Sequence, residues 1–477
     1  MSQNPTLPSV AIAGGGLAGL AAACALSDSG LRVTLLERRP YLGGRASSYE
    51  HPGTGEVVDN CQHVLFRVCT NLVEFYRRIG VEDKIRWYDE MTFIEPGGRS
   101  SVMRDSPLPA PLHTAPSFLH FPFLTVKDKL AISRAIAALT LTIQPDTGKS
   151  FLQWCHDHGQ TKTAINRFWK PILVSALSED LDLISISYAA QVVRESMKSP
   201  TARHMGVPSI PLTDLYNRAG DYIRARGGEI LFRTSLDCFS PNSSQVDIRI
   251  TDSDRKEKEE SFDYLILALP FNTVDRVLPE TPDAAPLREQ LAHFESCPIT
   301  GIHLWFDRQI TDLDHAVLLD RTIQWMFHKS RLLVTRAAAD REPGGSYIEL
   351  VVSASKSLID KARAEIVDLA LKEVCEFFPA AGGAALVKSA VIKEVHATYS
   401  PRPGIDGYRP RQSTLWPRVF LAGDWTATGW PATMEGAVRS GYLAAEELLH
   451  AAGMRTKDKK LLTPDLPPSG LMRLFYR

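Results

Sequence analysis

A glycine-rich segment near the start of the chain has the composition of a dinucleotide-binding turn. Gly14, Gly16 and Gly19 follow a short apolar run at 9–13, and an Ala- and Leu-rich stretch at 20–29 comes next. The first glycine permits a tight turn, the second lets the backbone approach a diphosphate, and the third allows close helix packing. The unpaired N–H groups at the start of the following helix attract the same diphosphate.

An acidic residue at the end of the next apolar run strengthens this interpretation. A second buried strand is expected at 33–36, and Glu37 follows it, 18 residues after Gly19. A carboxylate there accepts hydrogen bonds from ribose hydroxyls and repels a 2′-phosphate. The pattern predicts a βαβ unit in which Leu17 and Ala18 also contact the cofactor. The alternative is a glycine-rich turn with a purely structural role.

A second glycine pair lies shortly after the acid. Gly43 and Gly44 allow close backbone approach, and Arg45 offers a fork of donors to phosphate oxygens. The alternative is a plain turn with a solvated arginine. The run from Arg38 to Arg45 resembles the flavin amine oxidase and phytoene desaturase superfamily, in which Gly-Gly-Arg forms a second clamp on the diphosphate of FAD. The resemblance implies FAD as the cofactor and places Arg38 at its site.

A third signature lies near the C-terminus, where an apolar strand at 419–422 precedes a loop and a helix that starts near Thr433. In the superfamily the aspartate after the strand binds the ribityl chain, and the helix start points its N–H groups at the flavin. Leu236 matches a residue whose backbone holds the adenine, although it could equally be an ordinary strand-end residue. The resemblance adds these cofactor-binding residues: Leu236, Gly423, Asp424, Thr433, Met434 and Gly436.

Three longer stretches, at 59–65, 397–404 and 425–437, resemble a narrower family, the bacterial squalene-associated FAD-dependent desaturases. That family is understood as the hydroxysqualene dehydroxylases of squalene and hopanoid biosynthesis. The resemblance implies that reduced FAD delivers hydride to an allylic C30 isoprenoid alcohol, with loss of water. The chain departs from the family at Cys61, where a small residue, often glycine, is expected.

The leaving hydroxyl of such a substrate needs a proton. His63 is the first candidate for the general acid, because its ordinary pKa lies nearest neutrality. Alternatively, His63 orients the loop or hydrogen-bonds the flavin; Tyr399 and Glu435 are secondary candidates for the acid. A hydrocarbon substrate requires a long apolar site, or the aromatic residues simply pack in the core. The candidate walls are 118–124, Trp154, Phe168, Trp169, Trp305, Phe306, Trp325, Met326 and Phe327.

Other functions remain open on the sequence alone. A carotenoid-type desaturase would run hydride transfer in the opposite direction, and an amine oxidase would act on another substrate class. A prenyl carrier that has lost its flavin is a non-catalytic alternative. No residue fixes the direction of electron flow, and none identifies the electron donor.

The 477 residues predict an α/β protein with a Rossmann-type FAD-binding domain and a substrate domain made of a mixed sheet and helices. We expect the FAD-binding domain to combine 1–90, 206–290 and 405–455. The substrate-binding domain would combine 91–205 and 291–404, with a tail at 456–477. Helices are expected at 126–143, 150–157, 161–177 and 187–197. Strands of the substrate domain are expected at 302–306, 323–327, 332–335, 347–353 and 387–396.

Composition excludes several partners. There are 54 Lys plus Arg and 55 Asp plus Glu, so the net charge of −1 gives no overall attraction to nucleic acid or to an anionic membrane. Seven widely spaced cysteines predict neither a disulfide framework nor a metal site. The N-terminus lacks the features of a signal peptide, which predicts a cytoplasmic protein. A lipid-soluble substrate would bring it to the inner face of the membrane through 118–124 or 471–477; a buried channel is the alternative.

Overall fold

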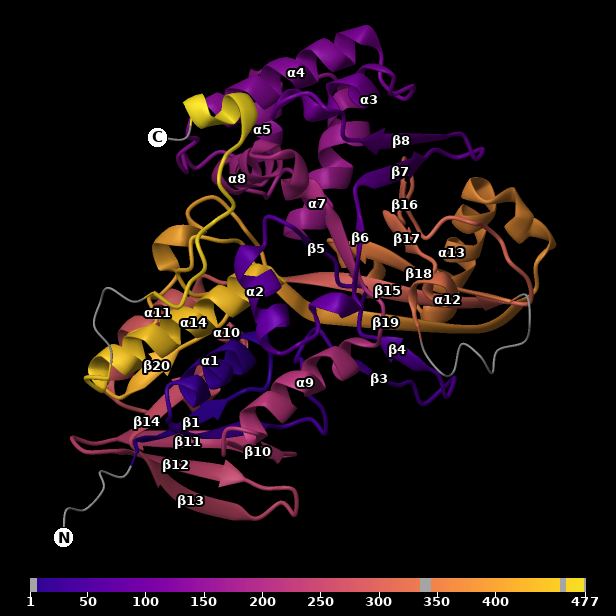
Figure 1. The fold of residues 1–477 in the computed structure, drawn as a ribbon. Helices are drawn as coiled ribbons and strands as arrows, with labels where there is room; N and C mark the ends of the chain where they lie inside the picture. Colours follow the sequence, from indigo (N-terminus) through magenta and orange to yellow (C-terminus); the bar gives the residue numbers. More distant parts are fainter. Residues whose placement is uncertain (1–6, 335–344, 455–459, 476–477) are drawn as a thin grey trace.

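The computed structural model describes residues 7–334, 345–454 and 460–475. A five-stranded parallel sheet forms the lower part of the molecule in Figure 1. Its strands come from widely separated parts of the chain. In spatial order they are β10 (Glu229–Phe232), β2 (Arg32–Glu37), β1 (Ser9–Ala13), β14 (Tyr264–Leu267) and β20 (Val419–Leu421). Residues of the three segments expected to form the FAD-binding domain therefore pair within one sheet.

Period-two burial on β1 explains how this sheet is covered. Val10 and Ile12 pack in the cluster that contains α1 (Leu17–Asp28), α9 (Leu212–Arg224) and α14 (Met434–Ala451). Ala11 and Ala13 belong to the cluster that includes a three-stranded antiparallel sheet. That sheet consists of β11 (Ser235–Pro241), β12 (Val246–Thr251) and β13 (Glu257–Phe262). Because successive side chains alternate between faces, both faces of β1 are buried.

A mixed seven-stranded sheet forms the second part of the molecule. It is antiparallel throughout except where β16 pairs with β7. Helix α13 (Arg363–Phe377) packs on one face in an aliphatic cluster. The strands are β19 (Leu386–Tyr399), β15 (Ser296–Phe306), β18 (Ser346–Ser353), β17 (Trp325–Phe327), β16 (His315–Leu318), β7 (Glu90–Ile94) and β8 (Ser100–Arg104).

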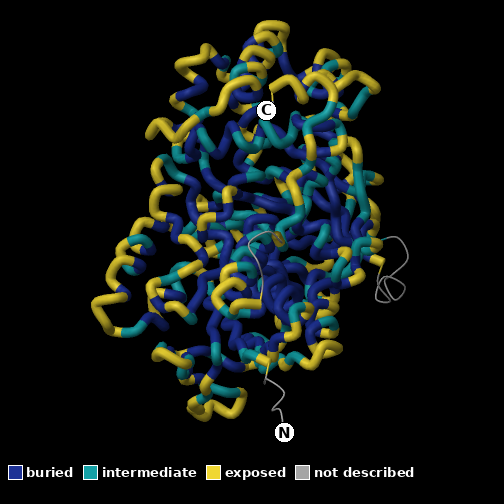
Figure 2. The backbone as a smooth tube through the Cα atoms, turned by 60° about the vertical axis from the view of Figure 1, so that its left-hand side comes forward, coloured by how far each residue is buried: buried dark blue, intermediate teal, exposed yellow. Residues whose placement is uncertain are grey.

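Helices cap the end of the molecule that lies furthest from β13 (Figure 1). They are α3 (Ala115–Leu119), α4 (Val126–Leu141), α5 (Phe151–Asp157), α7 (Lys170–Leu177) and α8 (Ile186–Met197), with a short α6 (Lys162–Ala164) and a π-helical segment (Ile165–Trp169) before α7. The C-terminal segment runs from α14 to this cap and ends in the 3₁₀ turn η10 (Gly470–Leu474). Figure 2 shows that buried backbone fills the middle of the molecule, whereas exposed backbone follows its outer loops.

The four helical stretches predicted between 126 and 197 are confirmed, with boundaries shifted by one or two residues. One strand prediction is wrong. The run at 332–335 is not a strand, because Leu332 ends the short helix α12 (Lys329–Leu332) and the next two residues lie outside any strand. Thr335 lies outside the described residues. A short apolar run does not distinguish a strand from a helical turn, and here the buried contacts of Lys329 hold the turn.

Candidate functional site

The first glycine-rich turn lies between β1 and α1. Two of its glycines have no room for a Cβ atom, whereas a third borders open space. A Cβ atom at Gly14, where φ is +112°, would lie 2.3 Å from the carbonyl oxygen of Ala268. One at Gly19 would lie 1.9 Å from the carbonyl oxygen of Gly14. A Cβ atom at Gly16 would instead meet only the Cα of Gly44, at 3.8 Å. The space beside Gly16 is therefore open, at the start of α1, where a diphosphate fits.

The two glycine segments lie side by side. The N–H of Gly43 donates to the carbonyl oxygen of Gly15 at 2.9 Å, and a guanidinium nitrogen of Arg39 donates to Gly44 at 2.8 Å. The buried carboxylate of Glu37 accepts bonds from the backbone of Gly15 at 2.8 Å and of Arg39 at 2.7 Å. A carboxylate offers about four lone pairs, so Glu37 retains capacity for two ribose hydroxyls.

The structure locates the remaining residues of this half of the predicted site. Leu17 and Ala18 are the first residues of α1 and are buried. Leu236 lies on β11, and the N–H of Thr234 just before it donates to the carbonyl oxygen of Glu37 at 3.0 Å. Arg38 is exposed beside the acid. The segment expected to hold the adenine thus lies against the residue expected to hold the ribose.

A contact between Arg45 and Asp424 joins the N-terminal and C-terminal motifs. A guanidinium nitrogen lies 2.7 Å from a carboxylate oxygen, and a second one donates to the carbonyl oxygen of Ala397 at 2.7 Å. The side-chain amide of Asn60 donates to the carbonyl oxygen of Arg45 at 3.1 Å. Burial opposes the charge of Arg45, but the carboxylate of Asp424 outweighs it and raises the pKa of the guanidinium. Arg45 therefore stays charged where a diphosphate would lie.

The start of α14 supplies the third part of the site. Thr433 caps the helix, because its hydroxyl accepts the N–H of Gly436 at 3.1 Å, and Met434 is the first helical residue. The N–H of Gly423 donates to the hydroxyl of Ser440 at 2.8 Å, which fixes the strand end against the helix. This arrangement presents a helix N-terminus beside Asp424, as the sequence predicts for a flavin site.

Glu435 does not enter the site. One of its oxygens accepts from the side-chain amide of Asn71 at 2.9 Å, and the other accepts from the N–H of Leu72 at 2.7 Å. Both donors lie in the first turn of α2 (Thr70–Arg78), where a carboxylate satisfies unpaired N–H groups. The suggestion that Glu435 serves as a proton donor is therefore corrected: its carboxylate caps a neighbouring helix.

The loop that carries His63 folds back on itself. The Nδ1 atom of His63 lies 2.7 Å from the carbonyl oxygen of Cys61, and the side-chain amide of Gln62 donates to the carbonyl oxygen of His63 at 3.1 Å. Burial lowers the pKa of His63, which favours the neutral ring at pH 7. Burial also keeps the thiol of Cys61 protonated by raising its pKa. The geometry favours His63 as a loop-orienting residue, and its role as an acid stays a prediction.

A buried ion-pair network below this loop was not predicted. The ammonium of Lys329 lies 2.5 Å from a carboxylate oxygen of Asp59, 2.7 Å from the side-chain carbonyl of Gln62 and 3.4 Å from a carboxylate oxygen of Glu349. Burial would lower the pKa of Lys329, but the two carboxylates outweigh it and raise that pKa. Because Asp59 and Gln62 flank Cys61, Lys329 connects this loop to α12, which lies along the chain between β17 and β18 of the seven-stranded sheet.

Tyr399 ends β19 in a buried phenol pair. Its hydroxyl lies 3.0 Å from that of Tyr188, which donates to Asp406 at 2.6 Å. Burial raises the pKa of Tyr399, so the phenol is neutral. Its ring packs against Phe294, whose ring in turn meets that of Trp425. The side chain thus stands in an aromatic cluster two residues after Ala397, which Arg45 contacts.

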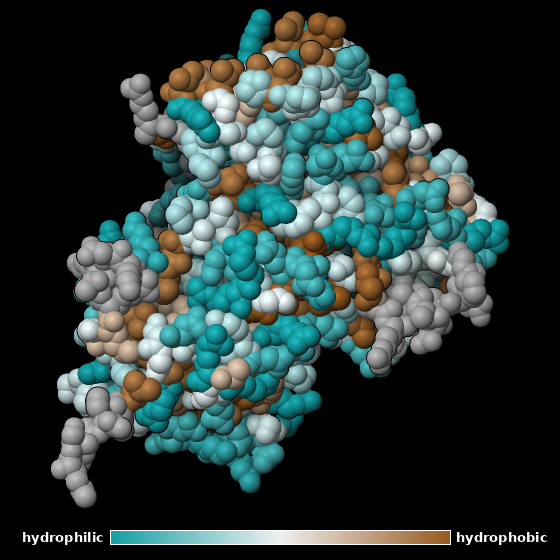
Figure 3. Space-filling view, viewed as in Figure 1, coloured by the Kyte–Doolittle hydropathy of each residue, from teal (hydrophilic) through white to brown (hydrophobic). Residues whose placement is uncertain are grey.

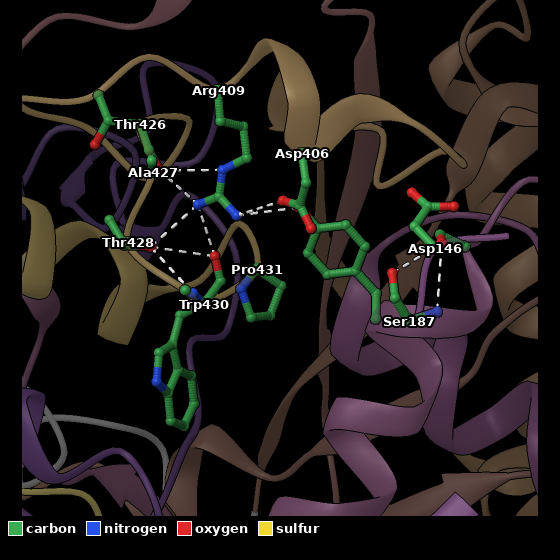
Figure 4. Close-up of polar contacts among 12 residues, drawn as sticks. Asp146, Ser187, Asp406, Arg409, Thr426, Ala427, Thr428, Trp430 and Pro431 are labelled. Carbon is green, nitrogen blue, oxygen red and sulfur yellow. Dashed lines mark hydrogen bonds and ion pairs between the residues drawn. The ribbon is translucent and has the colours of Figure 1, made fainter. Parts of the chain in front are cut away.

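Arg409 organises the loop between β20 and α14 (Figure 4). One guanidinium nitrogen donates to the carbonyl oxygens of Thr426 at 2.6 Å and Trp430 at 2.7 Å, and to the hydroxyl of Thr428 at 3.0 Å. The same side chain donates to Asp406 at 3.1 Å. A cavity of about 260 Å³ lies beside this network and is lined by Tyr188, Gln191, Asp406, Arg409, Ala427 and Gly429.

Most predicted aromatic walls pack against one another. Phe121 makes edge-to-face contacts with Phe93 and Phe123, and Phe118 does so with Phe168. They belong to one extended hydrophobic cluster with Cys61, Tyr399 and Trp425, which also reaches β11, β12 and β13. Three predicted walls lie elsewhere: Trp305 packs in a small separate cluster, and Phe306 and Met326 pack with α13.

The paired glycine segments, the acid at the end of β2 and the Arg45–Asp424 contact define an FAD-binding oxidoreductase. The chain belongs to the flavin-containing amine oxidoreductase family, whose model matches residues 17–449. Its cofactor is FAD, and the expected fold class is confirmed.

The chain aligns with two named relatives over nearly the full length of each. It is 27% identical to the 15-cis-phytoene desaturase of Synechococcus elongatus, over 92% of this chain and 95% of that protein. It is 29% identical to a probable zeta-carotene desaturase of the same organism, over 93% and 98%. Among solved structures it resembles putrescine oxidase bound to putrescine, with a TM-score of 0.70, 17% identity and coverage of 93% and 99%. That last likeness concerns the fold alone.

Proposed function

We propose that the chain reductively removes the hydroxyl group of hydroxysqualene to give squalene. The observation that carries this proposal is the convergence of the three dehydroxylase-like stretches at one place. Arg45 contacts the carbonyl oxygen of Ala397 and the carboxylate of Asp424, and Asn60 contacts the backbone of Arg45. Two of the three stretches therefore contact Arg45 directly, through Asn60 and Ala397, and the third begins at Trp425, next to Asp424, which pairs with Arg45.

The proposed reaction breaks the allylic C–O bond and forms a C–H bond. It consumes one hydride and one proton and releases water, so the substrate is reduced by two electrons. Bound FAD, in its reduced form, supplies the hydride. Arg45 and the start of α14 would hold the cofactor, and Arg409 fixes the loop that follows Asp424. Neutral Tyr399 and the rings around it give an apolar, water-poor surface for a hydrocarbon.

A second candidate function is carotenoid-type desaturation, which the named relatives favour. That reaction removes hydride and a proton from a saturated segment and needs an electron acceptor. Both candidates use a long apolar isoprenoid, so they differ in the direction of electron flow. The intact FAD clamps weigh against a prenyl carrier without flavin.

Product analysis separates the two candidates. Chemically reduced, FAD-loaded protein is incubated without oxygen with hydroxysqualene, and oxidised protein is incubated with phytoene and a quinone acceptor. Gas chromatography with mass spectrometry should find squalene in the first mixture and no desaturated carotenoid in the second. Desaturated product in the second mixture without squalene in the first would replace the proposal by the second candidate.

A further inference from the structure

Helix α4 exposes an apolar stripe to solvent. Val126, Leu130 and Leu141 are 74%, 54% and 46% exposed. At 100° per residue these positions fall within about 60° of one another around the helix. The opposite side, which includes Ile132 and Leu139, is buried in the core. The helix is therefore apolar on two faces, and only one of them is covered.

Neighbouring elements extend this stripe. Leu119 at the end of α3 is 63% exposed, Ile143 after α4 is 80% exposed, and Leu474 in η10 is 69% exposed. The backbone of η10 is held to this end of the molecule, because the N–H of Leu471 donates to the carbonyl oxygen of Ala110 at 2.8 Å. Figure 3 shows apolar side chains gathered along this edge, over α4 and η10. Contiguous apolar surface of this kind marks an interaction site, whereas single exposed residues do not.

Of the large apolar residues that the structure describes in the predicted membrane-contact segments, only some are exposed, namely Leu119, Leu471, Leu474 and Phe475. Phe118, Phe121 and Phe123 are buried, so the phenylalanines of 118–124 do not reach solvent. In the tail, Met472 is also buried, while Leu474 and Phe475 are exposed. The last two residues of the chain lie outside the described residues.

The charges around the stripe are basic. Lys127, Lys129 and Arg134 flank it on α4, and Arg473 lies in η10. Between 106 and 145 the one acidic residue is Asp128. Its side chain is buried and caps α4 through Thr125. The exposed charged side chains between 106 and 145 are therefore all basic, whereas Asp146, three residues after Ile143, is an exposed acid. The net charge of the whole chain is −1.

We propose that this apolar-basic surface docks on a lipid bilayer with anionic headgroups. It comprises Leu119, Val126, Leu130, Leu141, Ile143 and Leu474 with their basic neighbours. Apolar side chains insert at the interface, and lysine and arginine attract anionic lipids. A second copy of the chain fits less well, since a two-fold contact would bring like charges together. Among the described residues no helix can cross a membrane, so the contact is peripheral. The proposal does not rest on the reaction proposed above.

Vesicle co-sedimentation of the FAD-loaded protein tests this docking. The vesicles contain phosphatidylcholine alone or mixed with phosphatidylglycerol. The wild type should bind the mixed vesicles, and added salt should weaken binding. The double variant Val126→Asp/Leu130→Asp should lose binding, and Lys127→Glu/Arg134→Glu should lower it by about tenfold or more.

A matched control places the same change on other exposed apolar positions. Val387 and Leu415 are 60% and 69% exposed and lie outside the apolar-basic surface. Val387→Asp/Leu415→Asp should bind like the wild type, and all variants should keep their flavin. Failure of flavin-loaded wild type to bind mixed vesicles would overturn the proposal, as would equal binding by all variants. Self-association that Val126→Asp/Leu130→Asp abolishes, without vesicle binding, would assign the surface to a second copy instead.

Discussion

Arg45 and Asp424 form an ion pair of 2.7 Å although 379 positions separate them along the chain. The pair closes the FAD site, because it connects the second glycine segment to the strand end before α14. Arg45 uses two nitrogens for protein contacts and keeps further N–H groups for phosphate oxygens. We therefore expect this side chain to bind the cofactor as well as to join the two motifs.

Removal of this guanidinium should release FAD. A charge-assisted hydrogen bond contributes about 1.5–3 kcal/mol. Arg45→Met should therefore weaken FAD binding by about 10- to 100-fold, while Arg45→Lys should lose part of that affinity because it keeps a point charge without the fork. Equilibrium dialysis of FAD against the purified variants measures this. Equal affinity in all three proteins would show that Arg45 does not contact the cofactor.

Alanine substitutions at two glycines of the same turn should have different effects, one on stability and the other on FAD binding. A Cβ atom at Gly19 would lie 1.9 Å from the carbonyl oxygen of Gly14, so Gly19→Ala should lower the free energy of unfolding by about 1–3 kcal/mol. Gly16→Ala meets only the Cα of Gly44, at 3.8 Å. It should change the stability of the flavin-free protein by about 1 kcal/mol or less and still abolish FAD binding.

Thermal unfolding of the flavin-free proteins, together with flavin content after reconstitution, distinguishes the two effects. The free protein is needed because bound FAD adds its own stabilisation. A Gly16→Ala variant that retained full flavin content would contradict the position assigned to the diphosphate.

Local sequence patterns predicted one part of the candidate site and missed another. The turn at Gly14–Gly19 and Glu37 were predictable, because local spacing alone determines a βαβ unit. Arg45 and Asp424 were each predictable from their own motifs. The contact of Lys329 with Asp59 was not, since a single lysine carries no periodic signal and its partner lies 270 positions away. The failed strand at 332–335 has the same origin: a distant buried contact overrides a short apolar pattern.

The buried Glu349 should make stability depend on pH. Burial, opposed by Lys329, raises its pKa to about 7, against about 4.3 in an unfolded chain. The folded protein keeps a proton that the unfolded chain releases, so between about pH 4.5 and 7 stability falls as pH rises, by up to about 1.4 kcal/mol per pH unit. Above pH 7 this contribution is constant.

Glu349→Gln removes this titration while preserving the shape of the side chain. Of the neighbours, Lys329 has a raised pKa and Asp59 a lowered one, whereas burial lowers the pKa of His303 to about 3. Over most of this window His303 is protonated only in the unfolded chain, so it adds an opposite slope to the stability of both proteins. Urea unfolding of both proteins at several pH values should show that the free energy of unfolding of the wild type falls relative to that of the variant as the pH rises from about 4.5 to 7. Parallel profiles would mean that Glu349 does not change its protonation in this range.

His63 should act through its contact with the Cys61 carbonyl. If Nδ1 orients the loop, His63→Asn keeps a donor near the same place and should retain most of the turnover. His63→Phe preserves the bulk and loses the donor, so its turnover should fall by about fivefold, the effect of a hydrogen bond worth about 1 kcal/mol. Turnover and its pH profile are measured for each. Loss of activity in both variants, together with loss of the alkaline limb of the pH profile, would instead assign general-acid catalysis to His63.

The direction of electron flow tests the proposed reaction most directly. Fully reduced, FAD-loaded protein is mixed with hydroxysqualene in the absence of oxygen, and the flavin absorbance is followed while squalene is quantified. We predict that the oxidised flavin spectrum returns with one squalene formed per flavin. Phytoene added to the oxidised protein should leave the flavin spectrum unchanged. A spectrum that stays reduced with hydroxysqualene, while phytoene bleaches the oxidised protein, would contradict reductive dehydroxylation.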